Sequence, residues 1–203
     1  RCWPTTIYLL GKRSGMRIYY VTETGLSSGI AGTKSNPANL NYALTLTGTN
    51  SNIIRIAAGT YNISSSIIIQ SNTILEGGFN PFDWSKSNTN QTIIHRDSLN
   101  PNSSPNRITC ISAVNVNNFK ILDLSVNVAE AVGDGVSNYG IYINGCSNYV
   151  VSRCKLTVGA GSDGFTGVVG NVGSSGNAGS TGQSGSEQGD CCRLGGNGGS
   201  ASF

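Results

Sequence analysis

The chain has 203 residues, of which 28 are glycine and only 11% are charged, and its formal net charge is +3. This length suits one sizeable domain, alone or with an appendage. Lysine and arginine are scattered, so the sequence lacks the clustered basic residues that are typical of nucleic-acid binding. The longest apolar run, residues 7–10, is far too short to span a membrane.

The first part of the chain predicts a leading segment, a strand and a helix. Residues 1–17 hold an apolar run and then a basic patch, and their role is open between the tail of a preceding domain and a leading strand. Residues 18–21 are rich in β formers and predict a strand. Residues 35–44 predict one short helix, with Asn36 as its N-cap and Pro37 at the first helical position.

Short β-forming runs follow at close spacing. Each holds about three apolar or β-branched residues bounded by Asn, Ser or Gly, and they are residues 53–56, 59–61, 67–69, 73–75 and 92–94. Runs this short fit the coils of a solenoid better than the longer strands of a sandwich. Loops are expected at 77–84 and 95–107.

Residues 111–126 and 141–156 repeat each other at an offset of thirty. The aligned core positions are apolar in both copies, and they are separated by a mixture of two and three residues. That mixture predicts short strands joined by sharp corners rather than a helix or one long strand. Asn118 and Asn148 hold equivalent places and suit a corner, because Asn tolerates positive φ. Such units must stack on one another, as in a parallel β-helix, and the helix at 35–44 would cover its first coil.

Residues 18–158 resemble the right-handed parallel β-helix proteins, which include bacterial surface proteins and the pectin-lyase-like superfamily. The similarity lies in Ile18-Tyr-Tyr-Val21, the following helix, Ala58-Gly-Thr-Tyr61, Ile74-Leu-Glu-Gly-Gly-Phe79 and the coil from Ile141 to Cys154. The resemblance implies an all-β, right-handed solenoid over 18–158 with a short N-terminal capping helix. It is a resemblance of fold pattern and contains no catalytic motif.

From Gly161 to Gly185 a glycine stands at every third position without a break. This spacing suits an extended helix with three residues per turn, and the absence of proline argues against collagen. Residues 159–203 are therefore expected to form a polyglycine II-like extended region, with residues 195–199 starting a return segment. In that arrangement Gly173→Val should disrupt the packing, whereas the alternative is a flexible linker.

A β-helix followed by such a tract resembles large, type IX-secreted cell-surface proteins of the Bacteroidota, some of which are adhesins in attachment or gliding. The resemblance implies an exported, extracellular protein that continues beyond this fragment. Asp97-Ser98-Leu99 matches the short O-glycosylation acceptor pattern of that phylum, which makes Ser98 a possible modification site.

The chain has six cysteines, an even number that permits full pairing without showing it: Cys2, Cys110, Cys146, Cys154, Cys191 and Cys192. Cys146 and Cys154 fall on inward positions of one coil, so small core fillers are favoured over a disulfide there. Cys191 and Cys192 could pin the turn of the Gly-rich region with a disulfide. No C-x-x-C pair accompanies the single His95, so neither a zinc site nor another cofactor is expected.

Asp123 is expected to point outward from a strand, between Leu122 and Leu124. Arg153 stands thirty residues later and would lie about 5 Å from it on the adjacent coil. A surface ion pair is the favoured interpretation. Half of a catalytic site is the alternative, but the sequence brings no second acid to the pair.

The sequence favours a non-catalytic structural or adhesive module of a secreted surface protein, with extracellular carbohydrate or neighbouring surface and secretion proteins as partners. The alternative is a polysaccharide lyase or hydrolase, which would need at least two carboxylates facing one another on the outer coils. Ice binding is a weaker alternative, because threonine is not laddered at the thirty-residue offset.

Overall fold

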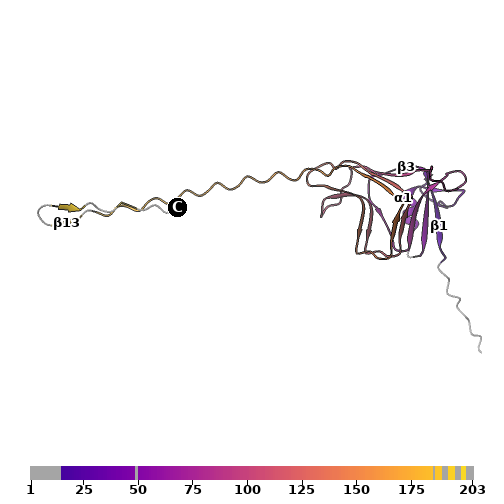
Figure 1. The fold of residues 1–203 in the computed structure, drawn as a ribbon, viewed down its shortest axis with the longest axis horizontal. Helices are drawn as coiled ribbons and strands as arrows, with labels where there is room; N and C mark the ends of the chain where they lie inside the picture. The colour runs from indigo at the N-terminus through magenta and orange to yellow at the C-terminus, as the bar shows by residue number, and fades with distance from the viewer. Residues whose placement is uncertain (1–14, 49, 185, 189–191, 195–197, 200–203) are drawn as a thin grey trace, which may run out of the picture. The chain divides into compact units, whose positions relative to one another are not determined.

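The computed structural model describes residues 15–48, 50–184, 186–188, 192–194 and 198–199 (Figure 1). The chain divides into two compact units, Arg1–Phe165 and Thr166–Phe203. The leading segment expected at residues 1–17 lies almost entirely outside the described residues.

The first unit is a parallel β-solenoid of about five turns. Its largest sheet has the strand order β1 (Arg17–Leu26), β2 (Asn52–Ala57), β5 (Thr73–Phe79), β8 (Lys120–Leu122) and β11 (Val150–Ser152). The second sheet contains β4 (Ile67–Ile68), β7 (Arg107–Val114) and β10 (Ser137–Asn144). The third contains β3 (Gly59–Ile63), β6 (Thr92–Arg96), β9 (Ser125–Val128) and β12 (Lys155–Val158).

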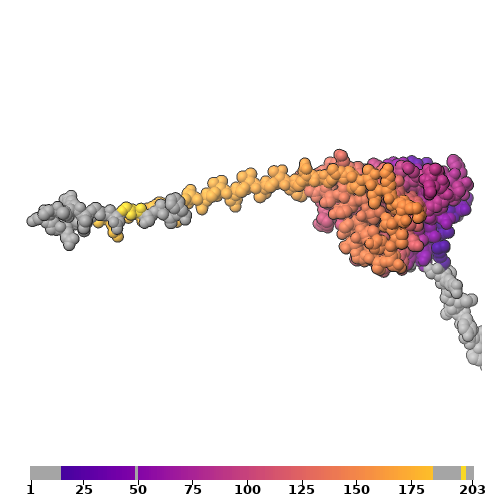
Figure 2. All heavy atoms as spheres, in the orientation of Figure 1, coloured from indigo at the N-terminus to yellow at the C-terminus, as the bar shows by residue number. Residues whose placement is uncertain are grey.

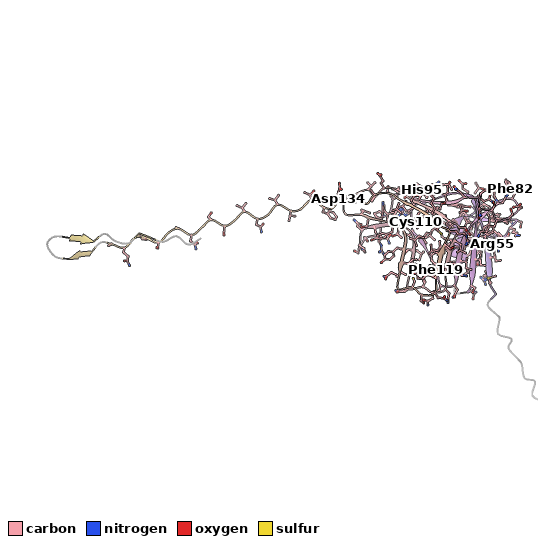
Figure 3. All side chains as sticks on the ribbon, viewed as in Figure 1. Arg55, Phe82, His95, Cys110, Phe119 and Asp134 are labelled. Atoms are coloured by element: carbon pink, nitrogen blue, oxygen red, sulfur yellow. The ribbon has the colours of Figure 1, made fainter. Side chains whose placement is uncertain are left out.

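All neighbouring strands in these three sheets pair in parallel, as stacked coils require. The coils follow one another in chain order, and the colours of Figure 2 trace them from indigo to orange. Between the sheets lies the main apolar core, which includes Ile54, Leu75, Ile94 and Phe119. Figure 3 labels Phe119 and Cys110, two of its members.

The predicted thirty-residue offset is confirmed in all three sheets. Ile141 pairs with Ile111, Val150 with Lys120, and Lys155 with Ser125. A constant offset places chemically equivalent side chains directly above one another along the solenoid.

The corners of the last two coils use left-handed backbone conformations at equivalent positions. Asn118 and Asn148 have φ angles of 57° and 53°, as predicted from the tolerance of Asn for positive φ. The Asn118 amide donates to the side chain of Asn72 at 3.2 Å, and Asn148 donates in turn to Asn118. This amide ladder satisfies polar groups where the strands end.

Asp123 and Arg153 form the other pair of corners, with φ angles of 55° and 53°. The sequence suggested instead that Asp123 lies in a strand and alternates outward between two leucines. The chain turns there, between β8 and β9, so the carboxylate is presented at an edge of the solenoid.

The short helix is present, but its predicted start is wrong. Helix α1 spans Leu40–Leu46, and its N-cap is Asn39, whose side chain accepts a hydrogen bond from the backbone N–H of Tyr42 at 2.7 Å. Asn36 and Pro37 lie before the helix. The reason is tertiary, because the fully buried Ala38 forms parallel bridges to β1 and must stay extended.

Strand β5 also extends further than predicted, because the loop expected from Gly77 begins only after Phe79. A Cβ on Gly77 would lie 2.4 Å from the carbonyl oxygen of Asp123 and 2.7 Å from the Leu124 side chain. Glycine therefore allows this strand to approach the corner of the next coil closely.

In the second unit, residues 166–184 have no helix or strand, and Val168, Val169 and Val172 are almost fully exposed. Two short antiparallel strands follow, β13 (Ser186–Gln188) and β14 (Cys192–Leu194). The chain thus turns back, and a Cβ on Gly199 would lie only 1.5 Å from the Ser180 carbonyl oxygen.

The packing expected at Gly173 is not seen, since a Cβ there would meet no described atom within 4 Å. The same holds for Gly167 and Gly170. Gly185 and residues 195–197, which belong to the expected tract and return segment, lie outside the described residues.

Candidate functional site

An open pocket of about 360 Å³ lies on one edge of the solenoid. The loop between β5 and β6 forms one wall, and the corners of the last two coils form the other. Nearly all lining side chains are polar or charged, and they include Lys86, Asn88, Asn90, Gln91, Asp123, Arg153 and Lys155. Leu124 is the one large apolar residue among the lining residues.

A chain of charged side chains with alternating sign runs into this pocket. The Arg55 Nε lies 4.0 Å from the carboxylate of Glu76, which is also paired with the Lys86 ammonium group. Lys86 in turn contacts Asp123, and Arg153 donates from Nε and Nη2 to the same carboxylate, the second bond at 2.9 Å. The Asp123 carboxylate is therefore held between two cations.

The charges of the pair are fixed by this arrangement. The hydrogen bond from Arg153, assisted by Lys86, lowers the pKa of Asp123 to about 2, although partial burial acts in the opposite direction. The same hydrogen bond raises the pKa of Arg153. At neutral pH the carboxylate is therefore ionised and the guanidinium is protonated.

The favoured prediction for Asp123 and Arg153, an ion pair between adjacent coils, is thus confirmed by the geometry. The expectation that no second acid joins them is wrong, because Glu76 reaches the network through Lys86. Glu76 pairs in register with Leu122, next to Asp123, but no repeat in the sequence links these two coils. Lys86 lies in a loop and had no sequence signal.

The pocket offers many hydrogen-bonding groups but a poor general base. Proton transfer in catalysis favours a group whose pKa lies near the working pH. The pKa of Asp123 lies far below neutral pH. Glu76 does not line the pocket. The arrangement suits recognition of a polar ligand by the Asn and Gln amides and by the cations of Lys86, Arg153 and Lys155.

The cysteines predicted to fill the core lie at the expected inward positions. Cys146 and Cys154 are free thiols, both partly buried against the core. Their Sγ atoms donate to the carbonyl oxygens of Ala113 at 3.3 Å and Ile121 at 3.6 Å. Cys191 and the side chain of Cys192 lie outside the described residues, so their disulfide stays a prediction.

Ser98 is half-buried in the loop that follows β6. Asp97 anchors this loop by accepting hydrogen bonds from Ser64 Oγ at 2.6 Å and from the backbone N–H of Leu99 at 2.9 Å. The buried Arg96 donates to the Leu99 carbonyl at 2.6 Å. O-glycosylation of Ser98 stays a prediction.

In the described part of the chain, no group of three or more His, Cys, Asp or Glu side chains is placed to hold a metal ion. No helix in the same residues is long and apolar enough to cross a membrane.

Comparisons with family models, with curated proteins and with solved structures find no match, so a proposed function depends on the geometry of the described residues.

Proposed function

We propose that this chain is a non-catalytic, carbohydrate-binding module of a secreted cell-surface protein. The observation that carries the proposal is the pocket beside Asp123, in which a carboxylate fixed between Lys86 and Arg153 is surrounded by amide and hydroxyl side chains. Such groups can donate to and accept from the hydroxyl groups of a sugar. The loop that forms one wall also presents Phe82, which is 93% exposed (Figure 3).

The fold pattern supports an extracellular, adhesive role. The parallel solenoid and the resemblance of its sequence to surface proteins suggest a right-handed β-helix that serves in attachment or gliding. In this proposal the Gly-x-x tract is a polyglycine II-like extension, whose partners are carbohydrate or neighbouring surface proteins. The approach of Gly199 to Ser180 supports close backbone packing in that region.

A polysaccharide lyase or hydrolase is the second candidate, and one observation favours it. Glu76 and Asp123 both contact the Lys86 ammonium group, so two carboxylates lie close together. A hydrolase pair, however, needs one protonated acid and one free carboxylate. Because Asp123 is ionised and engaged by two cations, the geometry supports binding better than catalysis.

Binding is tested with purified protein on an array of neutral and acidic glycans, followed by calorimetry on the glycans retained. Gln91→Ala changes an exposed pocket side chain, and Gln70→Ala is its matched control because Gln70 is exposed but does not line the pocket. We expect Gln91→Ala to weaken binding at least about fivefold, equivalent to one lost hydrogen bond, and Gln70→Ala to leave it unchanged. Equal effects of the two changes, or no retained glycan, would contradict the proposal.

Catalysis is tested on pectate, alginate and related polyuronates, with and without calcium. The wild-type protein should release no unsaturated product. Turnover that Asp123→Asn abolishes would replace the binding proposal with the lyase alternative.

A further inference from the structure

Within the first unit, no described residue covers the apolar core of the solenoid at its C-terminal end. In the coil that contains β8 and β9, the inward side chains of Phe119, Ile121, Val126 and Val128 are at most 5% exposed. Their counterparts thirty residues later are Tyr149, Val151, Leu156 and Val158, whose exposed fractions are 45%, 38%, 50% and 40% in that order. The side chains in both coils are apolar or aromatic, so their chemistry does not explain the difference in exposure. The difference arises because no further coil covers the last coil in the described structure.

The backbone at this end is also unpartnered among the described strands. β10, β11 and β12 are each the terminal strand of their sheet. An edge strand presents free N–H and C=O groups that can pair with another chain. The exposed side chains and the three free edges belong to the same coil, which we call the end coil (residues 137–158).

At the opposite end of the solenoid, the first strand, β1, is covered. Helix α1 packs on β1, and Val21 and Ala38 beneath this cover are fully buried. The outer side of β1 is occupied as well, since the backbone N–H of Tyr20 donates to the carbonyl of Gly32 at 3.0 Å and the backbone N–H of Leu26 donates to that of Pro37 at 2.9 Å. A head-to-tail stack of copies is therefore blocked at β1, whereas two end coils can face each other.

The composition of the end coil suits contact with an identical surface. Only Arg153 and Lys155 carry charge in residues 137–158, and Arg153 is paired with Asp123. Depletion of charge is typical of the centre of protein interfaces. Tyr149, Val151, Leu156 and Val158 would form the apolar centre of such a contact, and aromatic side chains such as Tyr149 contribute much of the energy of protein interfaces.

We propose that a second copy of this chain docks on the end coil, so that the protein is a dimer joined end to end around a twofold axis. The end coils of the two copies then run in opposite directions, so that the facing strand edges are antiparallel. One of the three strands faces its own counterpart across the axis, the other two face each other's counterparts, and Tyr149, Val151, Leu156 and Val158 become core residues. A twofold contact closes both open ends without growing into a fibre. This inference does not depend on the proposed carbohydrate binding.

The test is sedimentation velocity on the full 203-residue chain across a roughly hundredfold range of concentration, because dimerisation follows mass action. The wild-type protein should sediment at twice the monomer mass and dissociate on dilution. Val151→Lys and Leu156→Lys each place a charge in the contact and should give monomers. Ile68→Lys is the matched control, since Ile68 is also an exposed apolar strand residue, at 55%, but lies on β4.

Circular dichroism melting establishes that each variant is folded, which is expected because every replaced side chain is at least 38% exposed. Wild-type protein that stays monomeric at every concentration would overturn the proposal, leaving the end coil to a further coil or a different protein. A dimer that survives both Val151→Lys and Leu156→Lys would also overturn it, because the copies would then associate elsewhere.

Discussion

Phe119 and Tyr149 stack with ring centroids 5.2 Å apart and ring planes 9° from parallel, although thirty residues of chain separate them. Each follows an asparagine with positive φ, Asn118 or Asn148, so the two corners present their aromatic rings in the same direction. Phe119 is fully buried, but Tyr149 is 45% exposed. The repeat thus sets where each ring lies, whereas burial depends on whether another coil lies beyond it.

The core register is tested by Leu124→Asp. Leu124 is 1% exposed, so an aspartate there places an unpaired carboxylate in the apolar core. We expect a loss of more than about 3 kcal/mol in the free energy of unfolding, measured by urea denaturation. The control is Val132→Asp, at a side chain that is 69% exposed. It should change the free energy of unfolding by less than about 0.5 kcal/mol. Unchanged melting of Leu124→Asp would refute the register.

The close approach beside the pocket is tested by Gly77→Ala. The added Cβ would lie 2.4 Å from a backbone oxygen of Asp123 and 2.8 Å from the Cβ of Thr92, so the coils must separate. Overpacking of this kind should lower the free energy of unfolding by roughly 1–3 kcal/mol. Gly48→Ala is the control, because a Cβ on Gly48 meets nothing within 4 Å. Equal stabilities of the two variants would count against the packing.

The ion pair at the corner predicts a pH dependence of stability. Hydrogen bonding to Arg153 and contact with Lys86 lower the pKa of Asp123 to about 2 in the folded protein, below the value near 3.9 of an unfolded chain. The stabilisation that the ionised Asp123 carboxylate provides is therefore fully present above about pH 4 and is lost as the pH falls toward 2. Because solvent screens the ion pair, we expect it to contribute about 1 kcal/mol to the free energy of unfolding.

This contribution is measured by urea denaturation of the wild-type protein and Asp123→Asn at neutral pH and near pH 2. The difference in stability between the two proteins should be present at neutral pH and should shrink in acid. A difference that is the same at both pH values would show that the carboxylate charge is not responsible.

The Gly-rich region is tested by comparing two glycines in hydrogen exchange. Gly199→Val should speed exchange of the amides around Ser180, because a side chain cannot fit against the Ser180 carbonyl. Gly173→Val should leave exchange unchanged, since the described structure has open space there. Wild-type amides around Ser180 that exchange as fast as those of a free peptide would disprove an ordered return.

The sequence alone was sufficient to predict the solenoid, the thirty-residue register and the Asp123–Arg153 pair. These features repeat at a constant spacing, and stacking in parallel turns such a spacing directly into contacts. Asn118 and Asn148 could be assigned to corners because positive φ is a local property of the residue.

Only the tertiary structure decided the features that have no constant spacing. The start of helix α1 moved to Asn39 because Ala38 pairs with a strand far away in the sequence. Glu76 and Lys86 joined Asp123 because a strand from an earlier coil and an irregular loop meet at one edge. The exposure of Tyr149 has the same origin, since its sequence matches the buried Phe119 coil and burial depends on a neighbour that local sequence does not encode.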